Sequence, residues 1–317
     1  MSDVLLFGEA MALFVADEVG SLVDVNKYTR TIAGAEVNVA VGLSRLGHDV
    51  TYLTRLGNDS LGKYITNFLV QEGIDIRNIS YDSVYRTGIQ LKNKVEKGDA
   101  YAPYFRKGSA ASQIDASIVD TIDFSQFKLI HVTGIALAIS PSFRELSFAI
   151  VRQARDRGIT ISFDPNLRPK LWDTQAEMIA TINEMATYAD IILPGISEGQ
   201  ILTGEQTESE IAAFYHHRGV RDVVIKIGDQ GSYVSGQNIE KVVPGFKVDT
   251  IVDTVGAGDG FAAGLISGII EKLSLEEAVK RANAIGAIQV THWSDNEGLP
   301  THEELIAFMD SKSQRCA

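Results

Sequence analysis

Short apolar runs alternate with amphipathic segments along most of this chain. The runs are rich in Val, Ile and Leu, and the segments between them carry apolar residues at helical spacing. Apolar runs without polar alternation are typical of parallel strands that are covered by helices on both faces. We therefore predict an α/β fold built from parallel βαβ units. The expected strands are residues 4–7, 50–53, 129–132, 160–163, 191–193 and 223–227, and the expected helices are residues 35–46, 61–71, 142–156, 175–188 and 208–217.

Two stretches interrupt this rhythm, at about 10–32 and about 84–107. They alternate polar and apolar residues without helical period, as in Gly88-Ile89-Gln90-Leu91-Lys92. Such alternation is typical of strands with one buried face. We expect antiparallel strands outside the main sheet, carried by a single α/β domain that spans residues 1–317.

Composition limits the classes of partner and compartment. The formal net charge of −12 argues against a nucleic acid or an anionic membrane surface as partner. The single cysteine, Cys316, allows no disulfide within the chain, which fits a reducing cytoplasm. We find no leader-like start and no apolar stretch of membrane length, and therefore expect a cytoplasmic protein without a membrane partner.

The string Asp253-Thr254-Val255-Gly256-Ala257-Gly258-Asp259-Gly260 carries the strongest chemical signal. A β-branched run at 249–252 precedes it and an apolar-periodic segment at 261–273 follows it, which predicts strand, tight turn and helix. Small residues let backbone N–H groups approach a ligand, and the helix N-terminus adds positive potential. Taken alone, Asp259 is more readily explained as a helix N-cap. An anion cradle with a carboxylate at its rim is, however, what phosphoryl transfer to a hydroxyl requires.

This string resembles D-T-x-G-A-G-D, the C-terminal signature of the ribokinase-like (PfkB) sugar kinases. A second string runs from Ala33-Gly34-Ala35-Glu36-Val37-Asn38 to Leu46-Gly47 and resembles their N-terminal signature, G-G-x-x-x-N-x-A-x-x-L-x-x-L-G, with Ala33 in place of the first Gly. The resemblance covers essentially the whole chain. It implies a three-layer αβα ribokinase-like fold with a central, mostly parallel sheet and a small β-sheet lid over the sugar site. It further implies ATP and Mg²⁺ as cofactors and a dimer that forms through the lid.

The resemblance also implies which residues meet the sugar. Gly34, Ala35 and Asn38 belong to the Gly-rich turn and first helix that approach the sugar hydroxyls, although Asn38 could equally be a satisfied core amide. The string Tyr104-Phe105-Arg106-Lys107-Gly108-Ser109-Ala110 is similar to the 2-keto-3-deoxygluconate kinases, whose Tyr and Arg at these positions contact the substrate. Glu36 points to the same kinases, because many fructokinases carry Pro at that position.

Arg168 lies at the carboxyl end of an expected strand, in Asp164-Pro165-Asn166-Leu167-Arg168. In open α/β sheets ligands bind at that edge, and a guanidinium suits a carboxylate. Either arginine alone is more commonly just solvated, but together Arg106 and Arg168 are predicted to hold the carboxylate of an acidic sugar. Gln90 stands where relatives often carry Tyr, which leaves the exact sugar open. Asp295 matches a late acidic residue near the sugar and is equally explained as a turn residue.

The residues predicted to bind the nucleotide come from several separate segments of the chain. The segment 223–231 matches the family's V-x-K-x-G-x-x-G string near the ATP phosphates, with a plain hairpin turn as the alternative. The N-x-x-E motif linked to Mg²⁺ appears as Gly195-Ile196-Ser197-Glu198, so Glu198 is kept and predicted to meet the metal through water. The resemblance implies that the nucleotide-binding residues are Asn166, Ser197, Lys226, Gly228, Gly231 and Asn283.

A near match to a P-loop occurs at Gly57-Asn58-Asp59-Ser60-Leu61-Gly62-Lys63-Tyr64. Tyr64 replaces the Ser or Thr whose hydroxyl would hold Mg²⁺. We therefore expect a turn before a helix here.

These patterns predict an ATP-dependent kinase that transfers the γ-phosphate to a primary hydroxyl of 2-keto-3-deoxygluconate. Asp259 is the predicted base, kept ionised by the helix N-terminus, and the N–H groups of Gly256, Ala257 and Gly258 are the predicted anion hole. Fructokinase or another PfkB-type kinase is the nearest alternative, and a non-catalytic sugar-acid sensor is a more distant one. A nicotinamide dehydrogenase is disfavoured, because the first strand leads to Gly8-Glu9-Ala10 and not to G-x-G-x-x-G.

Overall fold

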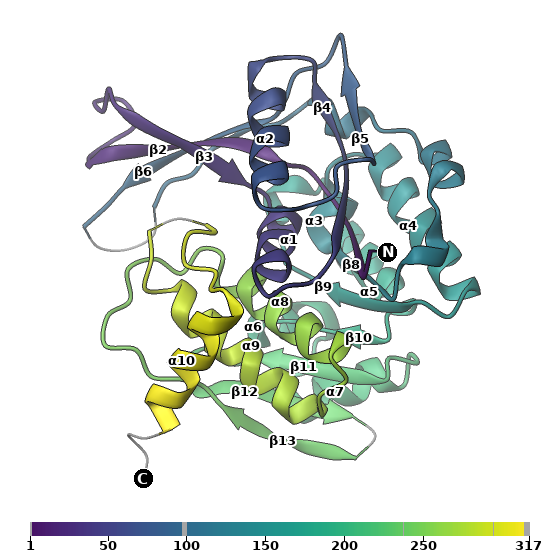
Figure 1. Cartoon of the computed structure of the whole chain (residues 1–317). Helices are drawn as coiled ribbons and strands as arrows, with labels where there is room; N and C mark the ends of the chain where they lie inside the picture. The colour runs from purple at the N-terminus through teal and green to yellow at the C-terminus, as the bar shows by residue number, and fades with distance from the viewer. Residues whose placement is uncertain (1, 97–99, 237, 294, 314–317) are drawn as a thin grey trace.

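A computed structural model describes residues 2–96, 100–236, 238–293 and 295–313 (Figure 1). Cys316 and residues 97–99 of the predicted lid segment lie outside the described residues. The strands are β1 (Val4–Phe7), β2 (Met11–Val19), β3 (Tyr28–Ala33), β4 (Val50–Gly57), β5 (Ile79–Asp82), β6 (Ile89–Lys94), β7 (Tyr104–Phe105), β8 (Leu129–Thr133), β9 (Thr160–Asp164), β10 (Ile191–Ile192), β11 (Asp222–Lys226), β12 (Gly231–Gly236) and β13 (Ile239–Pro244).

The α-helices are α1 (Ala35–Arg45), α2 (Ser60–Gln71), α3 (Gly134–Ala138), α4 (Pro141–Asp156), α5 (Gln175–Ala186), α6 (Ile196–Thr203), α7 (Glu208–His216), α8 (Ala257–Ile270), α9 (Leu275–Gln289) and α10 (His302–Ser313). Short 3₁₀ turns are η1 (Ala111–Gln113), η2 (Ala116–Thr121), η3 (Phe124–Gln126), η4 (Pro169–Leu171) and η5 (Gly228–Gln230). Within the described ranges, no helix is long and apolar enough to cross a membrane.

The main sheet has the strand order β13-β12-β11-β10-β9-β8-β1-β4-β5. The strands from β5 to β11 in this order are parallel, and β12 and β13 add an antiparallel edge. Each strand predicted at residues 4–227 is present, so the α/β prediction is confirmed. In β1, Val4 and Leu6 face one hydrophobic core whereas Leu5 and Phe7 face the other. Burial on both faces explains why these strands are apolar throughout.

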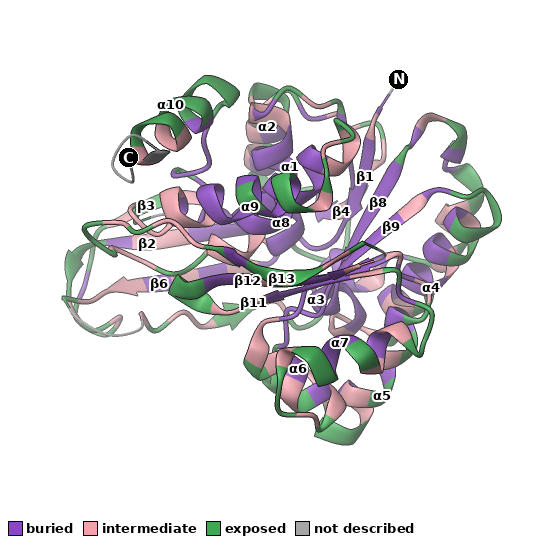
Figure 2. Ribbon diagram, turned by 90° about the horizontal axis from the view of Figure 1, so that it is seen from below, coloured by how far each residue is buried: buried purple, intermediate pink, exposed green. Residues whose placement is uncertain are grey.

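Helices cover both faces of this sheet, as predicted. Figure 2 shows α1, α2, α8 and α9 on one side and α4, α5, α6 and α7 on the other. The five predicted helices all form, with their ends shifted only slightly. The P-loop look-alike is a turn, because the Asp59 carboxylate accepts the N–H groups of Leu61 and Gly62 and caps α2.

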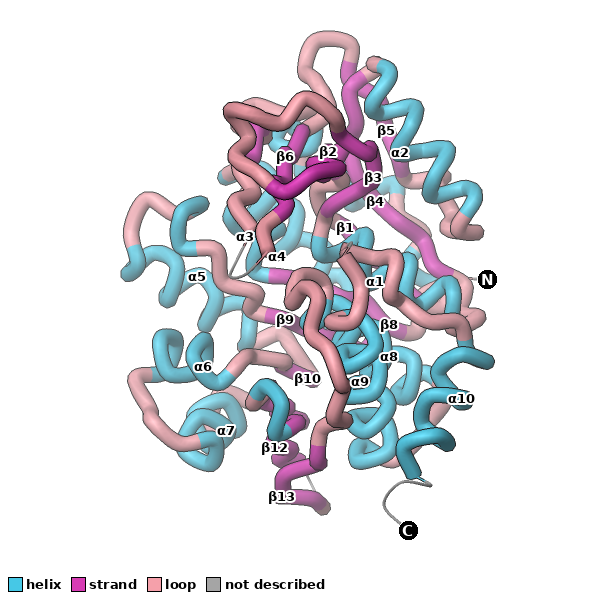
Figure 3. Tube along the Cα trace, turned by 90° about the vertical axis from the view of Figure 1, so that its left-hand side faces the viewer, coloured by secondary structure: helices cyan, strands magenta, loops and turns pink. Residues whose placement is uncertain are grey.

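A second sheet of strand order β3-β2-β6-β7 projects from one side of the molecule (Figures 1 and 3). Its strands fall in the two segments predicted as a lid. The prediction of purely antiparallel strands is wrong at the centre, because β2 and β6 are parallel whereas β2–β3 and β6–β7 are antiparallel. The parallel pair arises because β2 follows β1 and β6 follows β5, and those two strands run in the same direction through the main sheet.

The predicted strand at 249–252 is also wrong. These residues pair with no strand in the described part of the chain, and the Val252 N–H donates to the Val290 carbonyl at the end of α9. A β-branched segment forms a strand only where a neighbouring edge is available, and here the chain crosses from β13 to α8. The helix predicted at 261–273 is present as α8, which begins earlier, at Ala257.

Candidate active site

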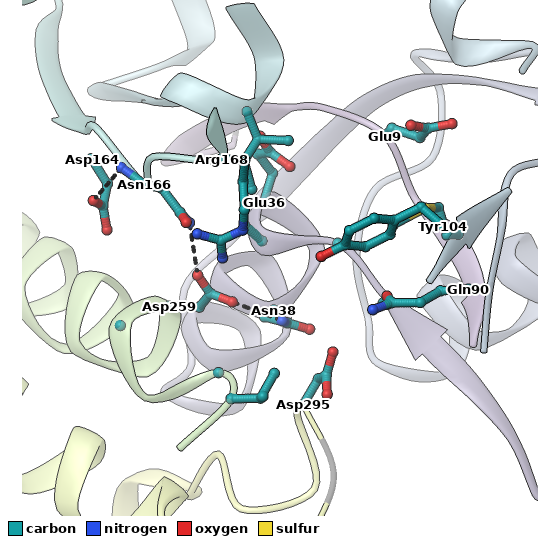
Figure 4. A pocket seen from close by; sticks show the side chains of 18 of the residues that line it. Glu9, Glu36, Asn38, Gln90, Tyr104, Asp164, Asn166, Arg168, Asp259 and Asp295 are labelled. Atoms are coloured by element: carbon teal, nitrogen blue, oxygen red, sulfur yellow. Dashed lines mark hydrogen bonds between the residues drawn. The ribbon is translucent and has the colours of Figure 1, made fainter. Parts of the chain in front are cut away.

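A cavity of about 330 Å³ lies between the carboxyl edge of the main sheet and the small sheet (Figure 4). The ends of β1 and β9, the start of α1 and the start of α8 form its walls. Gln90 and Tyr104 are cross-strand partners that reach it from the small sheet. Every predicted sugar-side residue lines it: Gly34, Ala35, Asn38, Gln90, Tyr104, Arg106, Arg168 and Asp295.

Asp259 faces this cavity from the first turn of α8. Gly256 is the N-cap of the helix, so the N-cap explanation of Asp259 does not hold. Asn38 Nδ2 donates to Asp259 Oδ2 at 2.8 Å, and Asn166 Nδ2 lies 3.5 Å from Oδ1. Burial raises the pKa of Asp259 to about 6, and the charge of Asp164 acts in the same direction. The shift is opposite to the one expected from the helix N-terminus, but at neutral pH the carboxylate still predominates.

The turn before α8 forms a backbone cradle. Gly256 has a φ of 80°, and a Cβ there would lie 2.2 Å from the Asp295 carbonyl oxygen, so only glycine fits. Among the described residues, the N–H groups of Gly256 and Gly258 have no protein acceptor, whereas the Ala257 N–H reaches the Thr254 carbonyl at 3.4 Å. Within the described part of the chain, two of the three predicted donors are therefore available to bind an anion.

A second cavity, of about 340 Å³, lies against the same helix start. Its apolar wall includes Phe246 and Phe261. It shares Lys226, Thr254 and Gly258 with the first cavity, so ligands in the two cavities would meet at the N-terminus of α8. Predicted residues that line it are Ala257, Gly258, Lys226, Gly228, Gly231 and Asn283.

Asn283 is engaged with the protein itself. Its Oδ1 accepts the Ser232 hydroxyl and its Nδ2 donates to the Val243 carbonyl, so it ties α9 to β12 and β13 beside the second cavity. The segment 223–231 is both a hairpin and part of that cavity, so the two explanations of it are compatible.

Lys226 connects the two cavities electrostatically. Its Nζ lies 2.8 Å from Asp164 Oδ2, and Asp164 Oδ1 accepts the Asn166 N–H at 3.1 Å. Asn166 has a φ of 38°, in the left-handed region that a non-glycine residue adopts at a cost. Sequence reasoning quoted the string that opens with Asp164 but did not select this carboxylate.

The two predicted arginines have different neighbours. Arg106 Nε donates to the buried Glu9 Oε2 at 2.6 Å. The charge of Arg168 partly offsets the burial that raises the pKa of Asp259, and Figure 4 shows its guanidinium beside Asn166 and Asp259. A clamp of both arginines on one carboxylate therefore stays a prediction.

Glu9 and Glu36 are two buried acids that line the first cavity, and sequence reasoning did not place either in the site. Glu36 accepts the Thr133 hydroxyl, and burial raises its pKa to about 7. A Cβ at Gly8 would lie 2.3 Å from the Glu36 carboxyl group, and one at Gly88 would lie 2.6 Å from Glu9 Oε1, so glycines make room for both acids. Glu9 follows β1 at the ligand-binding edge, which is the same signal that selected Arg168.

The predicted metal contact is held by backbone donors. Glu198 lines the first cavity, and its two oxygens accept the N–H groups of Leu167 and Gly195, each at 2.7 Å. Ser197 is exposed and lines neither cavity. In the described ranges, no group of three or more acidic, His or Cys side chains forms a metal cage. Carboxylates at Glu198 and Asp164 fit a Mg²⁺ that is held mainly by phosphates and water.

Comparison with known proteins agrees with this geometry. The model of the pfkB family carbohydrate kinases matches residues 1–302. The 2-dehydro-3-deoxygluconokinase of Bacillus subtilis (strain 168) is 45% identical over 98% of this chain and 96% of its own. A PfkB protein from Polaromonas sp. JS666 has a TM-score of 0.88 and 43% identity over 97% of this chain and 100% of its own.

A putative ribokinase II from E. coli, solved in complex with ATP and Mg²⁺, has a TM-score of 0.88 and 26% identity over 98% of this chain and 100% of its own. The family match, the full-length relative and the shared fold together lead to one conclusion. This chain belongs to the pfkB family of carbohydrate kinases.

Proposed function

We propose that this protein phosphorylates 2-keto-3-deoxygluconate, also named 2-dehydro-3-deoxygluconate, at its primary hydroxyl with ATP as the phosphoryl donor. The observation that carries the proposal is the position of Asp259. Its half-buried carboxylate faces the first cavity, beside the cradle where the first and second cavities meet. A sugar hydroxyl bound in the first cavity would lie between this carboxylate and a phosphate bound in the second.

The residues divide the chemistry in a simple way. Asn38 donates to Asp259 Oδ2 at 2.8 Å, and Oδ1 has only the longer contact of 3.5 Å with Asn166, so Oδ1 is the oxygen that would accept the hydroxyl proton. A pKa of about 6 keeps Asp259 ionised at neutral pH, and a loose phosphoryl transition state needs no stronger base. The free N–H groups of Gly256 and Gly258 and the Lys226 ammonium would stabilise the charge on the transferred phosphate. Bound Mg²⁺ supplies further neutralisation of the phosphates.

The two arginines that line the first cavity support an acidic sugar as the substrate. In a chain of net charge −12, Arg106 and Arg168 both line the cavity that also contains Asp259. A neutral sugar such as fructose requires no cation for its recognition. Glu36 and the string around Arg106 also favour the acid sugar, as does the B. subtilis relative, whose name states that activity. A sensor without catalysis would need neither the Asp259 carboxylate nor the free N–H donors.

The test is a coupled ADP-release assay with Mg-ATP and 2-keto-3-deoxygluconate, fructose, ribose and gluconate in parallel. We expect strong preference for 2-keto-3-deoxygluconate. Arg168→Gln should raise the KM for the acid sugar, with the nearby exposed Lys170→Gln as the matched control. Preference for fructose would keep the kinase and remove the carboxylate argument, and no turnover on any sugar would favour the sensor.

We also propose that two copies pair through the small sheet in the cytoplasm. Val19, Tyr101 and Phe105 are exposed on this sheet and its adjoining loop, and aromatic side chains are enriched in protein interfaces. The single cysteine supports a reducing compartment. Light scattering should give the mass of a dimer, and Phe105→Asp should shift it towards the monomer.

A further inference from the structure

Lys92 lies on β6 in the small sheet, and its ammonium is buried between two carboxylates. Its Nζ lies 2.6 Å from Asp253 Oδ2 and 3.1 Å from Asp295 Oδ1. The side chain of Lys92 is only 4% exposed, and those of Asp253 and Asp295 are 12% and 7% exposed. Charges at these distances and at this depth are little screened by solvent. The three residues therefore form one tightly coupled cluster.

The two acids of this cluster come from different segments next to the site. Asp253 precedes the cradle, and its Oδ1 also accepts the Val255 N–H at 3.0 Å. Asp295 lines the first cavity, and its carbonyl oxygen packs directly against Gly256. Through its ion pair with Asp253, Lys92 holds the segment before α8. Through its ion pair with Asp295, it holds the loop that supports Gly256.

Lys92 is also connected to the first cavity through its neighbour Gln90 on β6. Lys92 and Gln90 are two positions apart on β6, so their side chains project from the same face of the small sheet. Gln90 lines the first cavity together with its cross-strand partner Tyr104. Lys92 itself does not line that cavity, so any effect on the reaction must pass through these neighbours.

We propose that Lys92 is a positioning residue for phosphoryl transfer. Its ion pairs fasten the small sheet to the N-terminus of α8, so that a sugar held by Gln90 and Tyr104 presents its hydroxyl to Asp259. The inference rests on the proposed function, because it assumes a sugar in the first cavity and a phosphate at the cradle. Without the fastening, the small sheet can lift, the sugar binds loosely, and water can take its place as phosphoryl acceptor.

The test compares Lys92→Met with Lys94→Met in the full chain. Lys94 is the next residue on the same face of β6, and its ammonium lies 5.1 Å from the Trp293 ring, outside the cluster. We would measure the KM for the sugar, the KM for ATP and the ratio of ADP released to sugar phosphorylated. Lys92→Met should raise the sugar KM roughly tenfold to a hundredfold and raise the ADP-to-product ratio. It should leave the KM for ATP near the wild-type value, and Lys94→Met should match the wild type throughout.

Two more variants keep the test decisive. Lys92→Arg retains the charge and should keep the ADP-to-product ratio near the wild-type value. Asp253→Asn is the variant to use if Lys92→Met fails to fold, and it should show the pattern expected for Lys92→Met in weaker form. A purely structural ion pair predicts a lower unfolding temperature with an unchanged ADP-to-product ratio, and that result overturns the proposal. So does Lys92→Met behaving like Lys94→Met. A wild-type protein inactive on every sugar would instead remove the proposed function.

Discussion

Asn38 and Asp259 share a hydrogen bond of 2.8 Å although 221 positions separate them. Asn38 lies on α1 and Asp259 on α8, and these helices lie side by side on one face of the main sheet (Figure 1). Asn296 donates to Asn38 Oδ1 at 3.3 Å and so orients its amide. The bond engages Oδ2 of the carboxylate, whereas Oδ1 has only the longer contact of 3.5 Å with Asn166. One contact therefore joins the two sequence signatures in a single site.

Replacing Asp259 by Asn should abolish most of the activity and preserve the fold. Asn has the same shape but cannot accept the hydroxyl proton, and general-base groups contribute roughly 10²–10⁴-fold to turnover. The measurement is kcat by ADP release, with circular dichroism to verify folding. Asp249→Asn, at an exposed position ahead of the cradle, is the control and should retain full activity. Near-normal turnover of Asp259→Asn would show that another group takes the proton.

The pKa of Asp259 predicts opposite pH trends for activity and stability. Burial raises this pKa from 3.8 to about 6, so kcat/KM should fall as the pH drops below about 6 because the base becomes protonated. Since the folded pKa is the higher one, the contribution to the free energy of unfolding is fully present below 3.8 and is lost as the pH rises through about 6.

Asp259→Asn removes this titration and isolates the stability effect. We would measure the free energy of unfolding of both proteins in urea. The value for the variant minus the value for the wild type should be more positive at about pH 8 than at about pH 5. Glu36 titrates in both proteins and largely cancels in the difference. A stability difference that does not change with pH would contradict the raised pKa.

Glu9 should control the affinity for the acid sugar through Arg106. Its carboxylate holds Arg106 Nε at 2.6 Å in a buried pair, which leaves the other guanidinium N–H groups to point elsewhere. Glu9→Gln weakens a charge-assisted bond of about 1.5–3 kcal/mol, so we expect the sugar KM to rise roughly tenfold or more with a smaller change in kcat. Glu18→Gln, at an exposed position on β2, should have no effect. An unchanged KM would mean that Arg106 is oriented without Glu9.

Gly256→Ala should damage both the cradle and the fold. The position has a positive φ, and the added Cβ would lie 2.2 Å from the Asp295 carbonyl oxygen. Gly219→Ala is the matched control, because Gly219 has a φ of 92° with nothing within 4 Å of the added Cβ. The control should cost only about 1–2 kcal/mol of stability, from the left-handed backbone, and keep its turnover. Equal losses in the two variants would show that the close contact at Gly256 is unimportant.

Local patterns predicted much of the architecture. The apolar run at Val4–Phe7 reads as a doubly buried strand, and the structure places its side chains in two cores. The turn before α2 was also predictable from the sequence, and in the structure Asp59 caps this helix. The run at 249–252 was misleading, because its β-branched residues favour a strand but it pairs with no strand among the described residues.

The site was predictable to the extent that its residues belong to recognisable strings. Asp259, Asn38 and Arg106 could be selected in this way, and all three line one cavity. Glu9 and Lys92 belong to no such string, and the ion pairs that give them their roles join distant parts of the chain. Ser197 is a motif position that is exposed and lines neither cavity, so its nucleotide role stays a prediction.

By itself, the sequence determined the layered α/β fold, the glycine cradle and the acid beside it, because these depend on residues close together in the chain. Only the tertiary structure decided which charges are buried and what they meet. Burial in the folded protein raises the pKa of Asp259, Arg106 forms an ion pair with Glu9, and Lys92 lies between Asp253 and Asp295. The physical reason is that desolvation and ion pairing depend on distance in space, and the residues that supply them here come from segments far apart in the sequence.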